Sequence, residues 1–427
     1  MVVPPDRLDR AALLNVQRER LRALLAEILP RNRFYARKFA EAGLAARDIG
    51  ALKDLALVPF TTKAELQADQ EAHPPYGEVL TYPLDRYNRM HQTSGTSGRP
   101  LRWLDTPESW DWLLRCWEKK YAIMGLRAGD RFFFPFTFGP FLGFWAAFDA
   151  TVRLGYLAMP GGGMSSLTRL RFLLDNQATV VLCTPTYALH LAEVSSENGL
   201  DLVSSPVRAL IVAGEPGGSI PATRQRIESA WGARVFDHTG LTEVGPVTIE
   251  CPENPGGVHV LETEYIVEVL DPRSGQLLPP GEVGEMVVTN LGRWGSPVLR
   301  YRTGDLVRVD PHTCPCSRSL LRLQGGILGR VDDMIHLRGN NVYPTALEAV
   351  IRRFAEVAEY RVHVDYTQAL PELRVELEPA ANGVASDLVQ RVDLAIRNEL
   401  LFRAQVTTVP PGSLPRFEMK ARRIIKN

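Results

Sequence analysis

The sequence predicts an α/β protein: a large N-terminal α/β domain with mostly parallel sheets plus a small β-subdomain, followed by a small α+β C-terminal domain. Its 427 residues exceed the about 100–200 residues of a typical single domain. Short apolar runs alternate with helical patterns in the first part of the chain, and a separate α+β pattern closes it. We place the N-terminal domain at 1–329, its β-subdomain at about 263–328, a junction at 330–332 and the C-terminal domain at 333–427.

The first ninety residues are predicted to be mainly helical, with charged amphipathic segments such as "RNRFYARKFAEAGL". Apolar runs at 178–185, 208–216 and 233–240 then predict buried strands of a parallel sheet, with helices between them. Each run ends in Gly, Pro, Thr or Asp. Ligands of α/β sheets bind at the carboxyl ends of such strands, so we expect a binding site there.

The pattern changes at about residue 263, where apolar and polar residues alternate on both sides of "DPRSG". This alternation predicts an antiparallel hairpin. Near the end of the chain, helices are expected at 345–357 and 386–402 and strands at 360–366 and 372–379. These four elements define the predicted C-terminal domain.

Composition excludes some classes of partner. Basic and acidic residues balance at 49 each, so neither nucleic acid nor an acidic membrane surface is expected as a partner, and a small molecule is favoured. The most apolar stretch, "FFFPFTFGPFLGFWAAFDA", is interrupted by Pro and Gly and falls short of the about 20 apolar residues of a membrane span. We expect it to form buried core or a pocket wall.

The cysteines and the N-terminus bear on location. The first residues lack the basic-then-apolar pattern of a signal peptide. Five cysteines, an odd number, argue for a reducing compartment rather than a disulfide framework. We therefore expect a cytoplasmic protein.

The stretch "HQTSGTSGRP" at 91–100 is the first candidate binding loop. Small residues let backbone N–H groups and hydroxyls approach a phosphate, and Arg99 adds positive charge. The spacing excludes a Walker A loop, which needs G-x-x-x-x-G-K-[ST]. A flexible turn of small polar residues remains the alternative.

Four further polar clusters follow in order: "DHTGLTE" at 237–243, "YRTGD" at 301–305, "GRVDD" at 329–333, and "PRFEMKARRI", which contains Lys420. Each alone would fit an ordinary loop or a solvated salt-bridge run. Together with "DLALVPFTTKAEL", "CTPTYALHLAE", "GEPGG" and "LRGNNVYPTALE", they make the chain resemble the adenylate-forming superfamily of acyl-CoA synthetases, adenylation domains and luciferases. The resemblance is closest to the phenylacetate-CoA ligase-like branch and covers essentially the whole chain.

The resemblance implies an ATP-dependent, AMP-forming ligase that makes an acyl-adenylate and transfers the acyl group to coenzyme A. A carboxylate attacks the α-phosphorus of a tetra-anionic nucleotide only when charge is neutralised and the groups are aligned. By resemblance, Lys420 is the catalytic lysine, a flexible point charge. Thr242 lies at the α-phosphate, and Glu243 holds Mg²⁺, a cation that prefers oxygen ligands.

The resemblance also implies a set of nucleotide contacts, with Asp305 on the ribose hydroxyls. The branch often carries Tyr where this chain has Thr239, so His238 either replaces a ring stacked on adenine or only hydrogen-bonds within the loop. The residues expected to bind ATP are Thr93, Ser94, Gly95, Thr96, Ser97, Gly98, Arg99, Gly214, Glu215, Pro216, Asp237, His238, Thr239, Gly240, Arg302 and Asp305.

Three smaller groups complete the site that the resemblance implies. Arg330 and Asp332 match the hinge about which the mobile C-terminal domain swings, and Arg338 and Gly339 match the thiol tunnel. The acyl pocket is expected to hold an aromatic acid, although apolar residues at such spacing also form plain core. Its expected residues are Phe138, Phe141, Phe144 and Ala213.

Cys251, His259, Cys314 and Cys316 form a separate set. Three thiols and an imidazole are ligands typical of structural Zn²⁺, and four protein ligands would leave no open position for catalysis. Some members of the branch share these elements. Four incidental loop residues are the alternative.

The sequence leaves other acceptors open. A related enzyme could load the acyl group onto the phosphopantetheine of a carrier protein or onto an amine. A non-catalytic nucleotide-binding protein on the same scaffold is a different class, but it would have no need of Lys420 in addition to Glu243 and Asp305. By resemblance only, a homodimer is plausible.

Overall fold

The computed structural model describes residues 7–93, 99–337, 340–365, 372–380, 387–418 and 420–426. The predicted phosphate-loop residues Ser94, Gly95, Thr96, Ser97 and Gly98 lie outside this range, as do the predicted thiol-binding residues Arg338 and Gly339.

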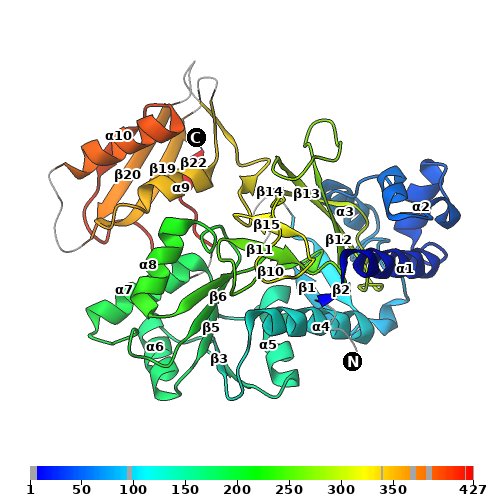
Figure 1. The fold of residues 1–427 in the computed structure, drawn as a ribbon, viewed down its shortest axis with the longest axis horizontal. Helices are drawn as coiled ribbons and strands as arrows, with labels where there is room; N and C mark the ends of the chain where they lie inside the picture. The colour runs from blue at the N-terminus through cyan, green and yellow to red at the C-terminus, as the bar shows by residue number, and fades with distance from the viewer. Residues whose placement is uncertain are drawn as a thin grey trace.

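A five-stranded parallel sheet lies in the lower left of the view, within the larger part of the molecule (Figure 1). Its strands lie in the order β4-β3-β5-β6-β7, and every neighbouring pair is parallel. The strands are β3 (Arg131–Phe134), β4 (Leu157–Pro160), β5 (Val180–Cys183), β6 (Ala209–Val212) and β7 (Arg234–Asp237). The fold class is confirmed, and the three apolar runs each contain the strand predicted there.

Helices cover both faces of this sheet, and the strands are apolar on both faces as a result. Along β6, Ala209 and Ile211 pack into one hydrophobic core, whereas Leu210 and Val212 pack into another. This period of two follows from the pleat, which points successive side chains to opposite faces. The helices of this region are α4 (Pro107–Met124), α5 (Leu142–Arg153), α6 (Ser166–Asp175), α7 (Pro185–Glu197) and α8 (Pro221–Trp231).

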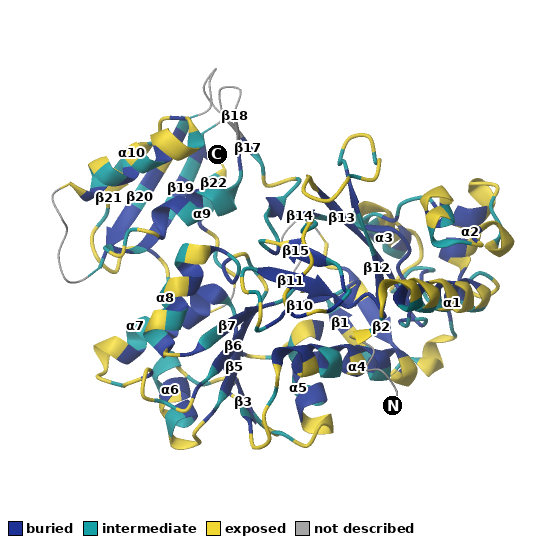
Figure 2. Cartoon of the chain, viewed as in Figure 1, coloured by how far each residue is buried: buried dark blue, intermediate teal, exposed yellow. Residues whose placement is uncertain are grey.

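The N-terminal region is helical, as predicted. Three helices begin at side-chain caps: α1 (Arg10–Ile28) at Asp9, α2 (Arg33–Glu41) at Asn32 and α3 (Lys63–Ala72) at Thr62. Short 3₁₀ helices at Ala46–Asp48, Leu52–Leu57 and Leu84–Arg86 follow or connect them. The outer side of α1 is exposed while its inner side is buried (Figure 2).

Antiparallel strands begin directly after the parallel sheet. The strands β12 (Tyr265–Leu270) and β13 (Val283–Asn290) form the predicted hairpin on either side of "DPRSG". They continue into a four-stranded sheet with β14 (Tyr301–Arg308) and β16 (Gly329–Arg330).

The parallel pattern ends earlier than predicted, at Asp237, because the strands between residues 240 and 260 are antiparallel. These are β8 (Gly240–Leu241), β9 (Gly245–Pro246), β10 (Thr248–Glu250) and β11 (Gly257–Val260), and β11 also pairs with β15 (Arg322–Gln324). A further antiparallel pair, β1 (Arg89–Gln92) and β2 (Arg102–Asp105), flanks the Gly/Ser/Thr loop.

The C-terminal part is α+β, as predicted, and lies over α7 and α8 (Figure 1). Its sheet has the order β21-β20-β19-β22. The predicted helix at 345–357 ends six residues early, because the chain turns after Ile351 and enters β19 at Val357. The elements are β17 (Ile335–Leu337), β18 (Asn340–Val342), α9 (Pro344–Ile351), β19 (Val357–Asp365), β20 (Glu372–Pro379), α10 (Leu388–Leu400), β21 (Gln405–Thr408) and β22 (Ile424–Lys426).

In the part of the chain that the structure describes, no helix combines the length and the apolar character needed to cross a bilayer.

Candidate active site

Several predicted site residues meet at the carboxyl edge of the parallel sheet. Ala213 and Gly214 follow β6, His238 follows β7, and Phe138 lies in the turn after β3. Because these strands are parallel, their carboxyl ends share one edge. The structure therefore gathers segments from separate parts of the chain on one side of the sheet, as the sequence predicted.

Glycine is required in the loop after β6. Gly214 has φ +94°, a conformation that residues with a side chain rarely adopt. At Gly218, an added Cβ would lie only 2.6 Å from Val212 Cγ2 and 2.8 Å from the carboxylate carbon of Asp237. The "GEPGG" motif thus allows a tight turn against β6 and β7.

Glu243 and Thr242 are held by residues that sequence analysis missed. The carboxylate of Glu243 accepts a hydrogen bond of 3.3 Å from the buried hydroxyl of Tyr301. The backbone carbonyl of Thr242 accepts one of 2.6 Å from Arg293. Arg293 is fully buried and paired with the equally buried Asp105 at 2.6 Å. This charge pair fixes the backbone beside Glu243 without contributing a new charge.

Asp305 lies on β14 next to the predicted hinge. Its carboxylate accepts a hydrogen bond of 2.8 Å from Arg330, which also contacts Asp332 at 3.5 Å. Burial raises the pKa of Asp305 to about 6, although Arg330 and Lys420 oppose the shift. The predicted ribose ligand and the predicted hinge are therefore in direct contact.

Arg302 faces other partners. Its guanidinium is hydrogen-bonded to Glu285 and to the carbonyl of Pro272. Arg99 has a side chain that is 81% exposed and lies 3.5 Å from Glu71. The partners of both arginines are therefore residues outside the predicted site.

Lys420 reaches the site from the C-terminal part of the chain. Its Cε lies 3.6 Å from the position that a Cβ on Gly214 would occupy. Removal of water by the surrounding protein lowers the pKa of Lys420, while the carboxylates of Asp305, Glu215 and Glu243 act in the opposite direction. An ammonium group therefore stands among the predicted nucleotide-binding carboxylates, although Lys420 is more than one hundred positions from each of them in the sequence.

Glu215 is engaged at both carboxylate oxygens. One accepts a hydrogen bond of 2.8 Å from the backbone N–H of Thr186, and the other one of 2.7 Å from the backbone N–H of Ala421. Burial raises the pKa of Glu215, and Arg423 opposes the shift. The predicted nucleotide contact thus also joins the two parts of the molecule.

Asp237 ends β7, His238 follows it, and the two differ in their surroundings. Asp237 is buried, accepts a hydrogen bond of 2.5 Å from Ser219, and has its pKa raised by burial to about 7. His238 packs edge-to-face against Trp117, with ring centroids 4.9 Å apart, and its Nδ1 lies 3.1 Å from Nζ of Lys120. Both partners belong to α4, so these contacts hold His238 against that helix.

Lys120 is the clearest residue that the sequence analysis missed. It is fully buried on α4, and its Nζ lies 4.5 Å from the centre of the Trp117 ring. Burial lowers the pKa of both Lys120 and His238 well below their ordinary values. A signal existed, because Lys120 falls in the apolar row of Leu113, Trp117 and Met124 at helical spacing.

The remaining described residues that were predicted to bind ATP lie in local turns and strand pairs. Thr93 accepts a hydrogen bond of 2.9 Å from Leu101 N–H and closes the base of the Gly/Ser/Thr loop. Thr239 donates its N–H to the Thr248 hydroxyl at 2.9 Å, and Gly240 pairs with Pro246. Pro216 is exposed next to Glu215.

The predicted acyl pocket consists of half-buried aromatic rings. Phe136 and Phe144 are stacked with centroids 4.0 Å apart, Phe138 lies 5.3 Å from Phe136, and Phe141 lies 5.9 Å from Phe144. Phe138, Phe141, Phe144 and Ala213 all retain intermediate exposure. Phe138 and Phe144 pack against the hydrophobic core, so the cluster fits either a pocket wall or the rim of that core.

Cys251, His259, Cys314 and Cys316 come together, although they lie up to 65 positions apart. All four are buried, and their ligand atoms lie within 4.8 Å of one another. The Cys251–Cys314 sulfur distance is 3.7 Å, and Cys316 Sγ lies 3.4 Å from His259 Nε2. Tetrahedral zinc with bonds of about 2.3 Å to sulfur and about 2.0–2.1 Å to nitrogen separates such ligand pairs by about 3.8 Å and about 3.6 Å. The donor set therefore fits Zn²⁺, and the Nδ1 of His259 lies 3.3 Å from the carbonyl of Leu320, as an outer partner should.

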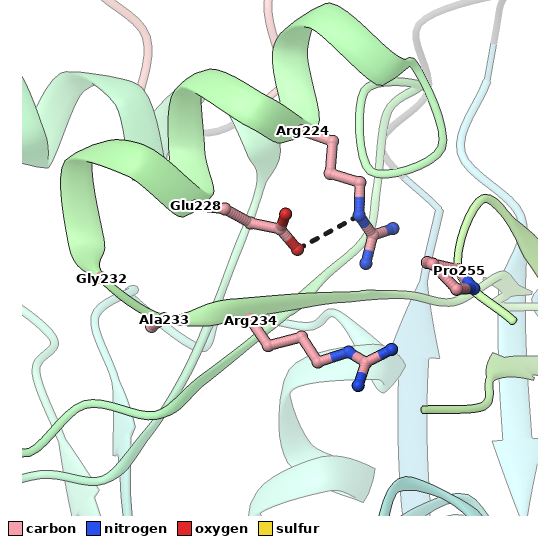
Figure 3. Close-up of a pocket in the computed structure, with 6 residues that line it drawn as sticks. All are labelled: Arg224, Glu228, Gly232, Ala233, Arg234 and Pro255. Carbon is pink, nitrogen blue, oxygen red and sulfur yellow. Dashed lines mark hydrogen bonds and ion pairs between the residues drawn. The ribbon is translucent and has the colours of Figure 1, made fainter. Parts of the chain in front are cut away.

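An open pocket lies at the other end of the parallel strands, away from their carboxyl ends (Figure 3). It sits where β7 begins, whereas His238 lies where β7 ends. Its two arginines are already occupied, since Arg224 pairs with Glu228 at 3.1 Å and Arg234 donates to the carbonyl of Pro252. The lining residues are Arg224, Glu228, Gly232, Ala233, Arg234 and Pro255. No predicted site residue lies among them.

Comparison with known proteins identifies the family to which this chain belongs. Residues 62–292 match the family described as AMP-binding enzyme, and residues 339–427 match the AMP-binding enzyme C-terminal domain. The chain belongs to the AMP-binding enzyme family. This confirms the predicted resemblance and the predicted enzyme class, an AMP-forming acid–thiol ligase.

Relatives of this family member match it over nearly their full length. The chain is 32% identical to the phenylacetate-coenzyme A ligase of Thermus thermophilus, with 98% of each protein covered. It is 32% identical to the phenylacetate-coenzyme A ligase of Pseudomonas putida, with 96% of this chain and 93% of the relative covered.

A solved structure shows which arrangement the two parts of this AMP-binding enzyme adopt. The crystal structure of 2-hydroxyisobutyryl-CoA ligase in the postadenylation state, in complex with 2-HIB-AMP, is 30% identical. It superposes with a TM-score of 0.95, covering 99% of this chain and 91% of that one. The same ligase in the thioesterification state, in complex with 2-HIB-AMP and CoA, superposes with a TM-score of only 0.75. The described arrangement is therefore closer to the postadenylation state.

Proposed function

We propose that this AMP-forming ligase activates an aromatic carboxylic acid with ATP and transfers the acyl group to coenzyme A. The observation that carries the proposal is that Lys420, from the C-terminal part of the chain, lies against Gly214 and within electrostatic reach of Asp305 and Glu243. A protein that only bound a nucleotide would have no use for a lysine brought in from the C-terminal part of the chain.

The reaction has two steps. In the first, a carboxylate oxygen of the acid attacks the α-phosphorus of ATP, the bond to the β-phosphate breaks, and pyrophosphate leaves. In the second, the thiol of coenzyme A attacks the acyl carbonyl, the thiol proton goes to solvent or a base, and AMP leaves. The first step brings two anions together, so cationic groups held in place stabilise it.

The proposed roles come from the family resemblance, and the contacts of these residues support them. Lys420 neutralises carboxylate and α-phosphate oxygens as they meet, and Thr242 lies beside the same phosphate. Glu243, oriented by Tyr301, would hold Mg²⁺, which supplies further positive charge to the phosphates. Asp305 would accept hydrogen bonds from the ribose hydroxyls. The predicted contacts of Ser94 to Gly98 with the β- and γ-phosphates remain part of the proposal.

The acid class is inferred from the aromatic wall. Phe138, Phe141 and Phe144 lie around the turn after β3 and retain exposed ring surface. Aromatic rings prefer offset-stacked or edge-to-face partners. A flat aryl or arylacetic acid would complete this cluster better than an alkyl chain.

The domain movement is part of the same proposal. Arg330 and Asp332 would form the hinge between the parts 1–329 and 333–427, and the segment that includes Arg338 and Gly339 would admit the thiol. Rearrangement about such a hinge is a general way to complete one site after another. Contact between Asp305 and Arg330 supports this role, since the hinge would then respond to the nucleotide.

We further infer that Cys251, His259, Cys314 and Cys316 hold one structural Zn²⁺. Four buried ligands at tetrahedral spacing leave no open position, so the ion would stabilise the fold around β11 and take no part in the reaction. None of the five cysteines forms a disulfide, which supports the inferred cytoplasmic location. A homodimer stays a prediction.

Pyrophosphate release tests the function. ATP, Mg²⁺ and a panel of aryl, arylacetic and aliphatic acids are supplied with and without coenzyme A. We expect release that depends on an aromatic acid and turns over only with coenzyme A. Release that ignores coenzyme A would point to a carrier protein or an amine as acceptor. Absence of release with every acid would contradict the enzymatic role and favour a nucleotide-binding protein.

A further inference from the structure

The carboxylate of Glu215 connects two segments that come from different parts of the molecule. Thr186 belongs to the first turn of α7, and Ala421 directly follows Lys420. Both donate a backbone N–H to Glu215, at 2.8 Å and 2.7 Å. Hydrogen bonds to a charged acceptor are about twice as strong as neutral ones, so this is a firm junction.

The bond to Thr186 fixes the position of the carboxylate. Helix α7 begins with the Thr184 cap and Pro185, which leaves the N–H of Thr186 free to donate to a side chain. A negative charge is favourable at this end of a helix. Glu215 is thereby held rigidly within the N-terminal part, with its second oxygen directed at Ala421.

Contacts other than the Glu215 bond also hold the segment around Lys420 against the N-terminal part. The Lys420 side chain lies against Gly214, with Cε 3.6 Å from the position that a Cβ there would occupy, an ordinary van der Waals distance. Just upstream, Glu418 pairs with the buried Arg169 at 2.9 Å, and Arg416 pairs with Glu193 at 2.8 Å. Of these contacts, the Glu215 bond is nearest in sequence to Lys420.

We propose that Glu215 is a positioning residue that places Lys420 for acid activation by holding the N–H of Ala421. This inference rests on the proposed function. It assigns Glu215 a role other than the nucleotide contact that the sequence suggested. The residue acts through Lys420 and does not touch the reacting atoms.

The arrangement of the two parts of the molecule predicts that Glu215 matters for only one of the two half-reactions. The structure superposes closely on a relative in the postadenylation state and less well on the same relative in the thioesterification state. The contact between Glu215 and Ala421 accordingly belongs to the arrangement that serves the adenylate. Losing it should slow adenylate formation and spare transfer to the thiol.

The test uses Glu215→Gln and Glu215→Asp in the full chain. Glutamine offers a single oxygen to two N–H donors, so one donor loses its acceptor. Aspartate keeps the charge but is one methylene shorter and cannot span both. Glu197→Gln, which changes an exposed carboxylate at the end of α7, is the matched control.

Three quantities are measured for each protein: the rate of pyrophosphate release, the rate of thioester formation from preformed acyl-adenylate and coenzyme A, and the affinity for ATP. For both Glu215 variants we expect pyrophosphate release to fall about 10- to 50-fold, a loss of about 1.4–2.3 kcal/mol. Thioester formation and ATP affinity should stay within about threefold, as in the control. Retained thioester formation also shows that the variant is folded.

Two results would overturn the inference. A parallel fall in both half-reactions would show a general structural role, and a fall in ATP affinity that matches the fall in rate would make Glu215 a nucleotide contact.

Amide hydrogen exchange separates this inference from the proposed function, because it needs no activity. The Ala421 N–H should exchange at least about tenfold faster in Glu215→Gln than in the wild type or in Glu197→Gln. Unchanged exchange there would overturn the inference even if the wild type is an active ligase. A wild type that releases no pyrophosphate would overturn the proposed function, and with it the role of Glu215 in acid activation.

Discussion

The ion pair between Glu193 and Arg416 gives a quantitative prediction about how the two parts of the molecule dock. Glu193 lies on α7, and both of its oxygens are 2.8 Å from Arg416 nitrogens. Arg416 also pairs with Glu378 of β20, which is only 1% exposed. The arginine therefore stays fixed to the C-terminal sheet, and its bond to Glu193 exists only while the two parts are docked.

The size of the effect follows from the electrostatics. Hydrogen bonds from Arg416 lower the pKa of Glu193 from its ordinary value of 4.5 to about 2. Such a shift corresponds to at most about 3.4 kcal/mol. The Glu193 side chain is 34% exposed, and solvent screening reduces such a pair to about 1 kcal/mol. Glu193→Gln should then shift the docking equilibrium about fivefold toward the undocked arrangement. Because the folded-state pKa is lowered, this contribution is present above pH 4.5 and is lost as the pH falls toward 2.

The assay compares the two half-reactions in the same protein at pH 7. If docking limits pyrophosphate release, Glu193→Gln slows that release; if the docked state dominates, the variant speeds thioester formation instead. In both cases the ratio of the two rates falls about fivefold. The effect should shrink at 1 M salt, where charges are screened within about 3 Å. An unchanged ratio, or a change equal to that of Glu197→Gln, would refute the reasoning.

Three further predictions concern the site and its surroundings. Lys420→Ala should lower pyrophosphate release about 10²–10³-fold with ATP affinity kept within about threefold, because the ammonium group matters most where charge develops; unchanged release would reject the catalytic role. Metal analysis of protein purified without chelators should find about one zinc per chain, and Cys316→Ser should lose it and unfold at a lower temperature; a metal-free wild type of equal stability would remove the proposal. Burial raises the pKa of Asp237 from 3.8 to about 7. Between these two pH values the folded protein holds a proton on Asp237 that the unfolded protein has lost, so the free energy of unfolding falls as the pH rises through this range. Asp237→Asn should therefore gain about 3 °C in Tm relative to the wild type between pH 5 and pH 8, and an equal difference at both pH values would contradict the pKa shift.

Much of the architecture was predictable from local pattern. The strands β5 and β6 are apolar at every position, because a parallel sheet is buried on both faces. The "DPRSG" turn and the alternation around it predicted the β12–β13 hairpin correctly. The boundary between parallel and antiparallel strands was less predictable. Short strands such as β8 and β9 consist of two residues each, too few for a period to be visible.

The candidate site was predicted through motif order more than through physical pattern. Glu243, Asp305 and Lys420 do converge, but Arg302 points to Glu285 instead. Lys120 was missed because it is a single charged residue in an otherwise apolar row of a helix. A lysine in such a row predicts either a boundary of the buried face or a functional group, and only the packing around it distinguishes the two.

The sequence by itself determined the elements, the glycines of the loop after β6 and the kinds of group available for chemistry. These properties depend on neighbouring residues, through periodicity and through the backbone conformations that a side chain permits. Only the tertiary structure decided that Glu215 holds Ala421 beside Lys420 and that Arg416 joins Glu193 to Glu378. A backbone N–H is the same at almost every position of the chain. Which carboxylate it meets is therefore settled by how distant segments pack, and no local pattern of residues records it.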